Sequence, residues 1–289
     1  MDNNDLIKIP FVSQEKIANI STYKTQGTVK GVFYPRNEEE LILVYNFLSK
    51  QDIPFKIIGN GSNLLIKDDC DFLFICTKKM KDKIRFCKNE VHFSSSVTLA
   101  KAYNLSLKKS LSGFQRLAGI PATLGGAIRN NASAFGQSVF DNLDKIKIFK
   151  DGKIKFLKKS DIIYSYHRTN LKDCLILSAK FILKPASWCE ICNEFGLYSK
   201  IRSEKQPKGF SCGSVFKNPA EASAGQLIED CKLKGKHSGN AKISEKHGNF
   251  IINTGNASFY DVKSLIELCQ QEVLKKYNIN LEKEVEIIE

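Results

Sequence analysis

Glycine and other small residues crowd the stretch from Gly113 to Gly136, GFQRLAGIPATLGGAIRNNASAFG, and this stretch limits the possible folds more than any other. Glycine lacks a Cβ, tolerates positive φ and lets another group approach the main chain closely. A run of such positions makes a concave row of N–H donors, the kind of surface that holds a diphosphate. Taken alone, the stretch is equally consistent with a tight turn that enters a packed small-residue helix.

A second turn of the same character lies earlier in the chain. Residues 57–66 read IIGNGSNLLI, an apolar run that breaks into a polar glycine turn and then resumes. Glycine and asparagine are the residues that such a turn requires. Two turns that allow close approach to the backbone indicate one large phosphate-bearing ligand held between them.

Length and composition indicate an ordinary soluble protein of two or three domains. The chain has 289 residues, 42% of them hydrophobic and 26% charged. No apolar run approaches the roughly 18 residues that span a bilayer, and the N-terminus lacks the basic start and apolar core of a signal peptide. The 9 cysteines are odd in number and scattered, which favours a reducing cytoplasm over a disulfide framework.

The formal net charge of +13 comes almost entirely from lysine. A basic surface suits either nucleic acid or an anionic small substrate. The lysines are spread along the whole chain without a basic run interleaved with aromatics, and the few arginines give little basis for reading nucleic-acid bases. The charge therefore indicates a solvated lysine surface, and we expect no nucleic-acid partner.

Hydrophobic periodicity predicts alternating strands and helices after a mixed lead-in at residues 1–20. A turn at Asp151-Gly152 predicts a hairpin, and the alternation argues for an α/β or α+β class. Predicted strands cover residues 29–35, 55–58, 72–76, 146–149, 154–157, 175–183, 250–253 and an edge-like 281–288, with a hairpin at 84–96. Predicted helices cover residues 38–48 behind an Asn37 cap, 99–107, 188–202, 224–231 and 260–276.

Cys189 and Cys192 form a lone CxxC pair inside a predicted helix. A zinc site needs a second pair of ligands, and none lies at usable spacing. A redox CxxC normally lies at a strand-to-helix junction near the first helix of the chain. We interpret both cysteines as ordinary helix residues and predict no metal site.

Three sequence blocks, in a fixed order, resemble those of a known family. They are Gly59–Leu65; Gly119–Ala127 followed by Asn131-Ala132; and Gly213–Pro219, supported by Ser244–His247, Asn249–Ile251, Leu281-Glu282 and Glu284-Val285. With these blocks the chain resembles the UDP-N-acetylenolpyruvoylglucosamine reductase (MurB) family from near residue 20 to the C-terminus. The chain is short and leaves little room for an insertion in its C-terminal part, so it resembles the compact subtype of that family.

The resemblance implies an α+β protein with an FAD-binding fold of the vanillyl-alcohol-oxidase (PCMH) type. The implied parts are two α/β subdomains at residues 1–75 and 76–187 and a substrate-binding domain at residues 188–289. The implied reaction is reduction of the enolpyruvyl group of UDP-N-acetylglucosamine enolpyruvate to UDP-N-acetylmuramate, with NADPH as reductant, in peptidoglycan precursor synthesis. A cytoplasmic monomer without a membrane partner is the expected form.

The same resemblance carries over binding residues. It implies FAD contacts from the two glycine turns, at Gly59, Asn60, Gly61, Ser62, Asn63 and Leu64, and at Gly119, Ile120, Pro121, Thr123, Gly125, Gly126, Asn131 and Ala132. It implies substrate contacts from Lys205, Lys217, Asn218 and His247. Lysine, as a point charge, suits the diphosphate of a UDP-sugar.

Two catalytic positions match the family pattern directly. The reaction adds a hydride to one carbon of the double bond and a proton to the other, and the flavin carries the hydride. By resemblance, Ser214 donates the proton, and Glu284 polarises the substrate or relays a proton. A serine hydroxyl is a weak acid, so cationic or hydrogen-bonding neighbours must hold the developing negative charge. Read without the family, these residues are a turn serine and a surface glutamate of an edge strand.

The third catalytic position is ambiguous. The family reads aromatic, any residue, Tyr, Arg, any residue, Ser, and residues 164–169 read YSYHRT. The aromatic register places His167 in the arginine slot, whereas a shift of one residue restores Arg168. Because arginine is the better bidentate partner for a carboxylate, the expectation is Arg168.

Three further residues depart from the family pattern. Cys212 replaces a small residue, and Ser133 and Lys232 each stand where a glycine is usual. None removes a proposed catalytic group. Cys212, close to Ser214 in sequence, raises the hypothesis that the site is sensitive to alkylation.

Two other functions stay open at this point. One is another FAD oxidoreductase of the same fold, acting on a different sugar or hydroxy acid; such an oxidase has no need of a proton donor at Ser214 with Glu284. The other is a basic nucleotide- or nucleic-acid-binding module, which predicts a colourless protein with salt-dependent binding to oligonucleotides.

Overall fold

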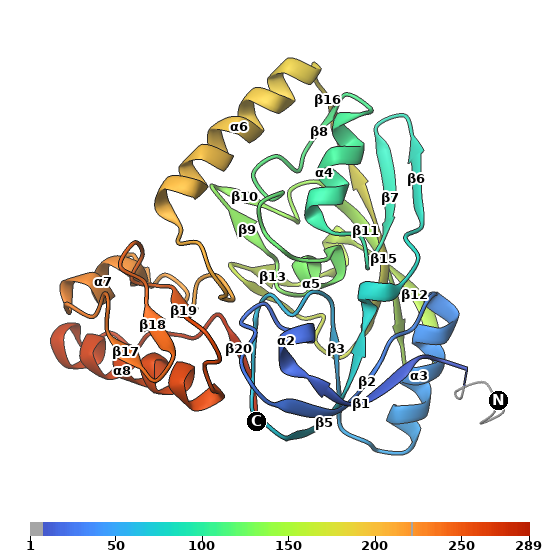
Figure 1. Cartoon of the computed structure of the whole chain (residues 1–289). Coiled ribbons are helices and arrows are strands. Elements are labelled where there is room, and N and C mark those ends of the chain that lie inside the picture. Colours follow the sequence, from blue (N-terminus) through green and yellow to red (C-terminus); the bar gives the residue numbers. More distant parts are fainter. Residues whose placement is uncertain (1–7, 221) are drawn as a thin grey trace.

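Four strands form the first sheet, drawn in blue at the bottom of Figure 1, where a computed structural model describes residues 8–220 and 222–289. Their order is β1-β2-β5-β3, with β1 antiparallel to β2 and the other pairs parallel. The bounds are β1 (Phe11–Lys16), β2 (Thr28–Phe33), β3 (Phe55–Ile58) and β5 (Cys70–Cys76), with α2 (Ile17–Ile20) after β1. The lead-in thus holds a strand and a short helix that the sequence did not predict, and residues 1–7 lie outside the described part.

Helix α3 (Glu38–Lys50) joins the first sheet to the second. The Asn37 side chain accepts a hydrogen bond from the Glu40 amide, so the helix begins where its cap was predicted. Its apolar stripe packs in one cluster with Phe149 of β11 (Leu143–Lys150) and with Leu175 and Leu177 of β15 (Leu175–Ile182). Helix α3 therefore shares one apolar cluster with strands of both sheets.

Five antiparallel strands form the second sheet, in the order β12-β11-β15-β7-β6. The predicted hairpin is confirmed, because Lys150 pairs with Lys153 across Asp151 and Gly152, which both have positive φ. Helices α4 and α5 pack with these strands in the largest apolar cluster. The bounds are β6 (Ile84–Cys87), β7 (Glu90–Ser94), β11 (Leu143–Lys150), β12 (Lys153–Lys158), β15 (Leu175–Ile182), α4 (Leu99–Leu107) and α5 (Leu124–Arg129).

The C-terminal part packs a small sheet against two helices, at the left of Figure 1. The long helix α6 runs along the side of the region that holds the second sheet and leads into the C-terminal part. The bounds are α6 (Trp188–Lys205), α7 (Ala224–Asp230), β17 (His237–Ser238), β18 (Ala241–Ile243), β19 (Ile251–Asn253) and α8 (Phe259–Tyr277). Cys189 and Cys192 lie in α6, as interpreted.

The end of the chain holds a shorter edge strand than predicted. Within the alternating segment 281–288, β20 (Glu286–Ile288) is a strand, and it pairs in parallel with β4 (Leu64–Ile66) in a two-stranded sheet. Alternation of charged and apolar residues fixes which side chains face a core but not which strand is the neighbour. The C-terminus therefore returns to the first glycine turn.

Short pairs of strands complete the fold and position the loops. They are β8 (Leu111–Ser112) with β16 (Lys184–Pro185), β9 (Ser133–Ala134) with β10 (Gln137–Ser138), and β13 (Tyr164–Ser165) with β14 (Arg168–Thr169); single 3-10 turns cover Thr77–Lys79 and Lys159–Asp161. Among the helices that the structure describes, none combines the length and apolarity needed to cross a bilayer. The mixture of helices with parallel and antiparallel sheets is the predicted α+β class.

Candidate active site

The first glycine turn connects β3 to β4 and lies directly against the second. The Asn60 side-chain amide donates to the Pro121 carbonyl at 3.0 Å. A Cβ added at Gly59 would clash with the hydroxyl of Thr123, so glycine is required for this contact. Gly61 has a φ of +63°, and a Cβ there would clash with the Ile20 carbonyl. The two stretches predicted to hold one ligand are thus adjacent.

The first turn presents unused donors. Within the described part of the chain, the backbone N–H groups of Asn60, Gly61, Ser62 and Asn63 meet no protein acceptor. Buried or half-buried N–H groups normally have a partner, and four in a row make a surface that suits a diphosphate. The arrangement fits the diphosphate of FAD.

The second turn is held more tightly by the protein itself. The Gly125 amide donates to the Ser95 carbonyl at 2.9 Å, and Thr123 caps α5 through the Gly126 amide at 3.4 Å. Gly119 lies against the Arg202 guanidinium of α6. Leu64 of the first turn and Ile120 and Ala132 of the second stretch are half-buried. The second stretch offers close packing more than free donors.

Asn131 has a structural position that the sequence did not predict. It is buried with a φ of +44°, its amide donates to the Ser165 carbonyl at 2.8 Å, and its carbonyl oxygen accepts from the Ser138 hydroxyl at 2.6 Å. Both ends of the side chain therefore bind protein. Asn131 connects the second glycine stretch to the hairpin of β13 and β14.

The Ser214 loop and the Glu284 segment run antiparallel and are hydrogen-bonded to each other. The Glu284 amide donates to the Val215 carbonyl at 2.8 Å, and the Lys217 amide donates to the Glu282 carbonyl at 2.9 Å. These bonds place Ser214 and Glu284 on neighbouring strands of chain. Two of the three predicted catalytic positions are therefore brought together, although 70 residues of sequence number separate them.

The first glycine turn joins this pairing. The Asn63 side-chain amide donates to the Glu284 carbonyl at 3.0 Å, and the Glu286 amide donates to the Asn63 carbonyl at 3.0 Å. On the other side, the Thr22 hydroxyl donates to the Ser211 carbonyl at 2.7 Å. Segments from the beginning, middle and end of the chain thus meet around one turn.

Cys212 lies beneath this junction and is inaccessible. Its Sγ is 3.2 Å from the Leu64 carbonyl and 3.4 Å from the Thr22 hydroxyl. The residue is buried, and burial raises the pKa of its thiol. Because alkylating agents react with an exposed thiolate, the hypothesis of an alkylation-sensitive site is disfavoured.

The hairpin of β13 and β14 separates the two candidates for the third catalytic position. Ser165 pairs with Arg168, so Tyr166 and His167 form the turn, and His167 has a φ of +49°. The His167 side chain is 10% exposed, and its Nδ1 lies 3.5 Å from Oε1 of Glu284. Arg168 is 62% exposed and points elsewhere, with Nη2 at 2.6 Å from Oε2 of Glu282.

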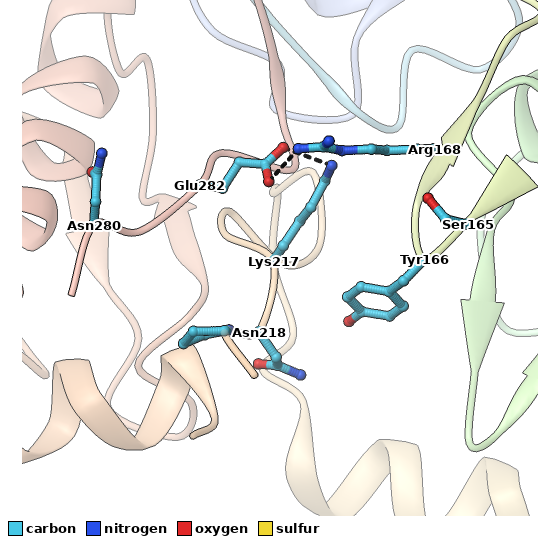
Figure 2. A pocket seen from close by; sticks show the side chains of 8 residues that line it. Ser165, Tyr166, Arg168, Lys217, Asn218, Asn280 and Glu282 are labelled. Atoms are coloured by element: carbon cyan, nitrogen blue, oxygen red, sulfur yellow. Dashed lines mark hydrogen bonds and ion pairs between the residues drawn. The ribbon is translucent and has the colours of Figure 1, made fainter. Parts of the chain in front are cut away.

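A pocket of about 370 Å³ opens beside the hairpin. Figure 2 shows the Glu282 carboxylate joined by dashed lines to both the Arg168 guanidinium and the Lys217 amine. Lys217 Nζ is 2.8 Å from Glu282 Oε1, and hydrogen bonds from Arg168 and Lys217 lower the pKa of Glu282 to about 2. The pocket is lined by Ser165, Tyr166, Arg168, Lys217, Asn218, Pro219, Asn280 and Glu282.

Burial shifts the two groups behind the pocket in opposite directions. It raises the pKa of Glu284 to about 7, and the positive charge of Lys217 opposes this rise. It lowers the pKa of His167 to about 4, and Lys217 acts in the same direction. Desolvation disfavours the charged form of each group. Between these two values, Glu284 carries a proton and His167 is neutral.

The predicted substrate residues divide into two sets. Lys217 and Asn218 line the pocket. The side-chain Oδ1 of Asn218 also accepts a hydrogen bond from the Ala224 amide at 3.0 Å. Lys205 is exposed at the end of α6. His247 packs against Gly225 of α7 and accepts from the Asn249 amide at 3.2 Å, and burial lowers its pKa. The His247 side chain is half-buried.

Glu282 and Tyr166 were missed as pocket residues. Two glutamates at positions 282 and 284 carry no sequence signal for which one is buried and which is paired with Lys217. Only the pairing of the chain end with the Ser214 loop decides this, because it directs one carboxylate outward and the other inward.

Two family models match the chain. The model described as the UDP-N-acetylenolpyruvoylglucosamine reductase C-terminal domain matches residues 205–288. The model described as an FAD binding domain matches residues 29–157. The first covers the Ser214 loop and Glu284, and the second covers both glycine turns.

Whole-length relatives carry the same name. A UDP-N-acetylenolpyruvoylglucosamine reductase of Fusobacterium nucleatum is 36% identical over 283 residues, which is 96% of this chain and 99% of the relative. One of Syntrophus aciditrophicus is 37% identical over 271 residues, 91% of this chain and 86% of the relative. The crystal structure of the Thermus caldophilus reductase matches at 27% identity with a TM-score of 0.82, over 98% of this chain and 99% of that one.

Proposed function

The chain belongs to the UDP-N-acetylenolpyruvoylglucosamine reductase (MurB) family, and from this premise we propose that its active site lies where the first glycine turn, the Ser214 loop and Glu284 meet. The protein is an FAD-dependent oxidoreductase with an FAD-binding domain and a MurB-type C-terminal domain. Its reaction is the NADPH-dependent reduction of the enolpyruvyl group of UDP-N-acetylglucosamine enolpyruvate, in peptidoglycan precursor synthesis.

The two glycine turns hold the cofactor in this proposal. The four unused N–H groups from Asn60 to Asn63 bind the FAD diphosphate, and the packed Gly119–Gly126 stretch forms the opposite wall. When bound, the flavin accepts a hydride from NADPH and passes it to the substrate. The protein supplies orientation and a boundary against water.

The pocket in Figure 2 receives the anionic end of the substrate. Lys217 and Arg168 supply two positive charges, and Asn218 supplies a neutral hydrogen-bonding group. Glu282 neutralises both cations in the structure described here. A diphosphate that enters the pocket competes with this carboxylate for Lys217, since both are anions that accept from the same ammonium group.

Ser214 and Glu284 supply the proton. As the hydride arrives at one carbon, negative charge develops toward the substrate carboxylate, and a hydroxyl proton from Ser214 quenches it at the other carbon. Glu284 still carries its proton near neutral pH because its carboxyl is buried. A neutral carboxyl, unlike a carboxylate, does not repel the negative charge that develops on the enolate.

In this proposal His167, not Arg168, occupies the third position of the family pattern, beside Glu284. The geometry favours His167 because it faces Glu284 at 3.5 Å, whereas Arg168 pairs with Glu282 at the surface. Arg168 then acts in binding the anionic substrate. Alanine variants separate the two: loss of turnover in R168A with full turnover in H167A would contradict the assignment.

The remaining parts of the proposal concern the molecule as a whole. We keep the proposed domain boundaries near residues 75 and 187; the first lies close to the end of β5 (Cys70–Cys76) and the second just before α6 (Trp188–Lys205). All 9 cysteines are free thiols, which supports the expected reducing cytoplasm. We retain the expectation of a monomer, which size-exclusion chromatography with light scattering tests directly.

One observation carries the proposal: Asn63 of the glycine turn is hydrogen-bonded to Glu284, whose amide is hydrogen-bonded to Val215 beside Ser214. The test is the absorbance spectrum of the purified protein under anaerobic conditions. We expect a yellow protein that NADPH bleaches and that UDP-N-acetylglucosamine enolpyruvate reoxidises. A yellow protein that ignores this substrate would favour a different flavin oxidoreductase, and a colourless protein that cannot take up FAD would contradict the site.

A further inference from the structure

Three polar side chains form a line that begins at the second glycine stretch and ends at Glu284. Ser133 Oγ lies 3.3 Å from Nε2 of His167, and Nδ1 of the same imidazole lies 3.5 Å from Oε1 of Glu284. The first distance is a hydrogen bond, and the second is at its outer limit. Contacts of catalytic groups are often long in ligand-free enzymes and shorten in the complex.

In the described part of the chain, Lys217 is the positively charged side chain that acts on Glu284. Lys217, from the Ser214 loop, acts on both Glu284 and His167. Burial raises the pKa of Tyr166, from the hairpin turn, and the charge of Glu284 acts in the same direction. Arg168 and Glu282 are paired with each other toward the pocket. Within the described part of the chain, the imidazole is the side chain that contacts Glu284 most closely.

We propose that Ser133 and His167 are a positioning pair, which holds an uncharged imidazole against Glu284 and so keeps Glu284 protonated during turnover. The inference rests on the proposed function of Glu284. Neither residue needs to touch substrate or flavin. Their effect passes through Glu284, which is the group that meets the reacting atoms.

The hydrogen-bond polarity of the line is consistent in one direction. Glu284 donates its carboxyl proton toward Nδ1, and Nε2–H donates to the Ser133 hydroxyl oxygen. This tautomer leaves the imidazole neutral, and the shifted pKa values of His167 and Glu284 agree with it. The serine hydroxyl retains its own hydrogen for a further acceptor. No proton is gained or lost within the line.

A guanidinium at position 167 would act differently. Its permanent positive charge would favour the ionised form of Glu284 and lower the pKa of that carboxyl. It is also longer than imidazole, and the Ser133 hydroxyl occupies the space into which it would extend. Ser133 and His167 are both departures from the family pattern, and the structure brings these two departures into contact.

The first test is the pH dependence of kcat/KM in the holoenzyme. We expect the alkaline limb of the profile near pH 7 in the parent, because the protonated carboxyl is the active form. H167R should move this limb down by about one pH unit or more, whereas H167N, which keeps a neutral polar group, should move it by less than about half of that. S133A should lower kcat with KM unchanged. H237N, at an exposed histidine in β17, is the control and should leave the profile unchanged.

An alkaline limb of the kcat/KM profile at the same pH in the parent, H167R and H167N would overturn the proposal.

A second measurement does not depend on turnover. The chain has 4 histidines, so ring nitrogen NMR signals of the parent can be assigned by their loss in H167N. His167 should remain neutral, with its proton on Nε2, until the pH falls to about 4. Protonation near the ordinary histidine value of about 6.5 would overturn the positioning role even if the substrate were a different one.

Discussion

The glycine turns and the side-chain cluster of Ser214, His167 and Glu284 differ in the chemical groups that they offer. The turns at Gly59–Asn63 and Gly119–Gly126 act through main-chain N–H groups and through the absence of side chains. In the proposed site, Ser214, His167 and Glu284 act through side chains from three distant segments, and His167 and Glu284 contact each other. Backbone sites require a local sequence pattern, whereas side-chain sites require tertiary pairing. Perturbing each region should therefore have a distinct signature.

The largest expected effect is on proton delivery. Ser214→Ala should reduce turnover by about 10²–10⁴-fold, the usual contribution of a positioned general acid. FAD content and reduction by NADPH should be unchanged, because the glycine turns remain intact. Steady-state kinetics together with the flavin absorbance of the purified variant measure both.

Ser211→Ala is the matched control for this variant. Ser211 lies in the same loop and contributes its backbone carbonyl to the Thr22 hydroxyl. Full activity in S211A with loss in S214A would assign the effect to one hydroxyl. If S214A lost its flavin, the two regions would not be separable as described.

The next effect concerns stability and its dependence on pH. Burial raises the pKa of Glu284 from 4.5 to about 7, so the unfolded state releases this proton first as pH rises. The contribution of Glu284 is fully present below pH 4.5 and is lost as pH rises to about 7. At pH 8 this loss is about 3 kcal/mol, from about 1.4 kcal/mol per pKa unit.

Glu284→Gln should remove this loss. Relative to the parent, its free energy of unfolding should increase by about 3 kcal/mol between pH 4 and pH 8, as measured by urea denaturation. Glu286→Gln, an exposed glutamate of the same segment, should change by less than about 0.5 kcal/mol. A parallel pH dependence in E284Q and the parent would show that Glu284 is not held neutral by the fold.

A smaller effect is expected from the backbone region. Gly61→Ala places a Cβ against the Ile20 carbonyl at a positive φ, so the turn must shift and its N–H donors lose their alignment. We expect at least about a tenfold loss of FAD affinity, on the order of 1.4 kcal/mol, measured by flavin fluorescence on reconstitution.

Gly152→Ala controls for backbone strain alone. Gly152 has a φ of +73° in the hairpin of β11 and β12, and its Cβ would meet no atom within 4 Å. It should cost stability but no FAD affinity. Equal loss of FAD in both variants would mean that the glycine turn has no special role in holding the cofactor.

The smallest effect is expected at the pocket surface. Glu282→Gln removes the carboxylate that pairs with Arg168 and Lys217, so both cations become available to an anionic substrate. KM should fall about two- to threefold at low salt and less at high salt, as for exposed ion pairs. An increase in KM would indicate that Glu282 itself binds the substrate.

The sequence predicted the backbone region better than the side-chain region, and the reason is physical. Gly59, Gly61 and the Asp151-Gly152 hairpin are local requirements of φ and space, so the pattern is visible in consecutive residues. The direction of Arg168 and His167 depends on which one follows the turn of a two-residue hairpin. One residue of register reverses it, and no local signal fixes that register.

Other features that the sequence did not predict have the same origin. Strand β1 and the pairing of β20 with β4 depend on partners elsewhere in the chain. The packing of His247 against α7 likewise depends on a distant partner, and its role in substrate binding stays a prediction. Local chemistry was predictable; long-range pairing and side-chain direction were not.

The central claim is that the flavin region and the proton-donating cluster are separate parts of one site. Anaerobic stopped-flow absorbance on S214A tests it most directly, by following flavin reduction with NADPH and then reoxidation with UDP-N-acetylglucosamine enolpyruvate. We expect bleaching at the parental rate and reoxidation at least about 100-fold slower. Reoxidation at the parental rate would contradict it.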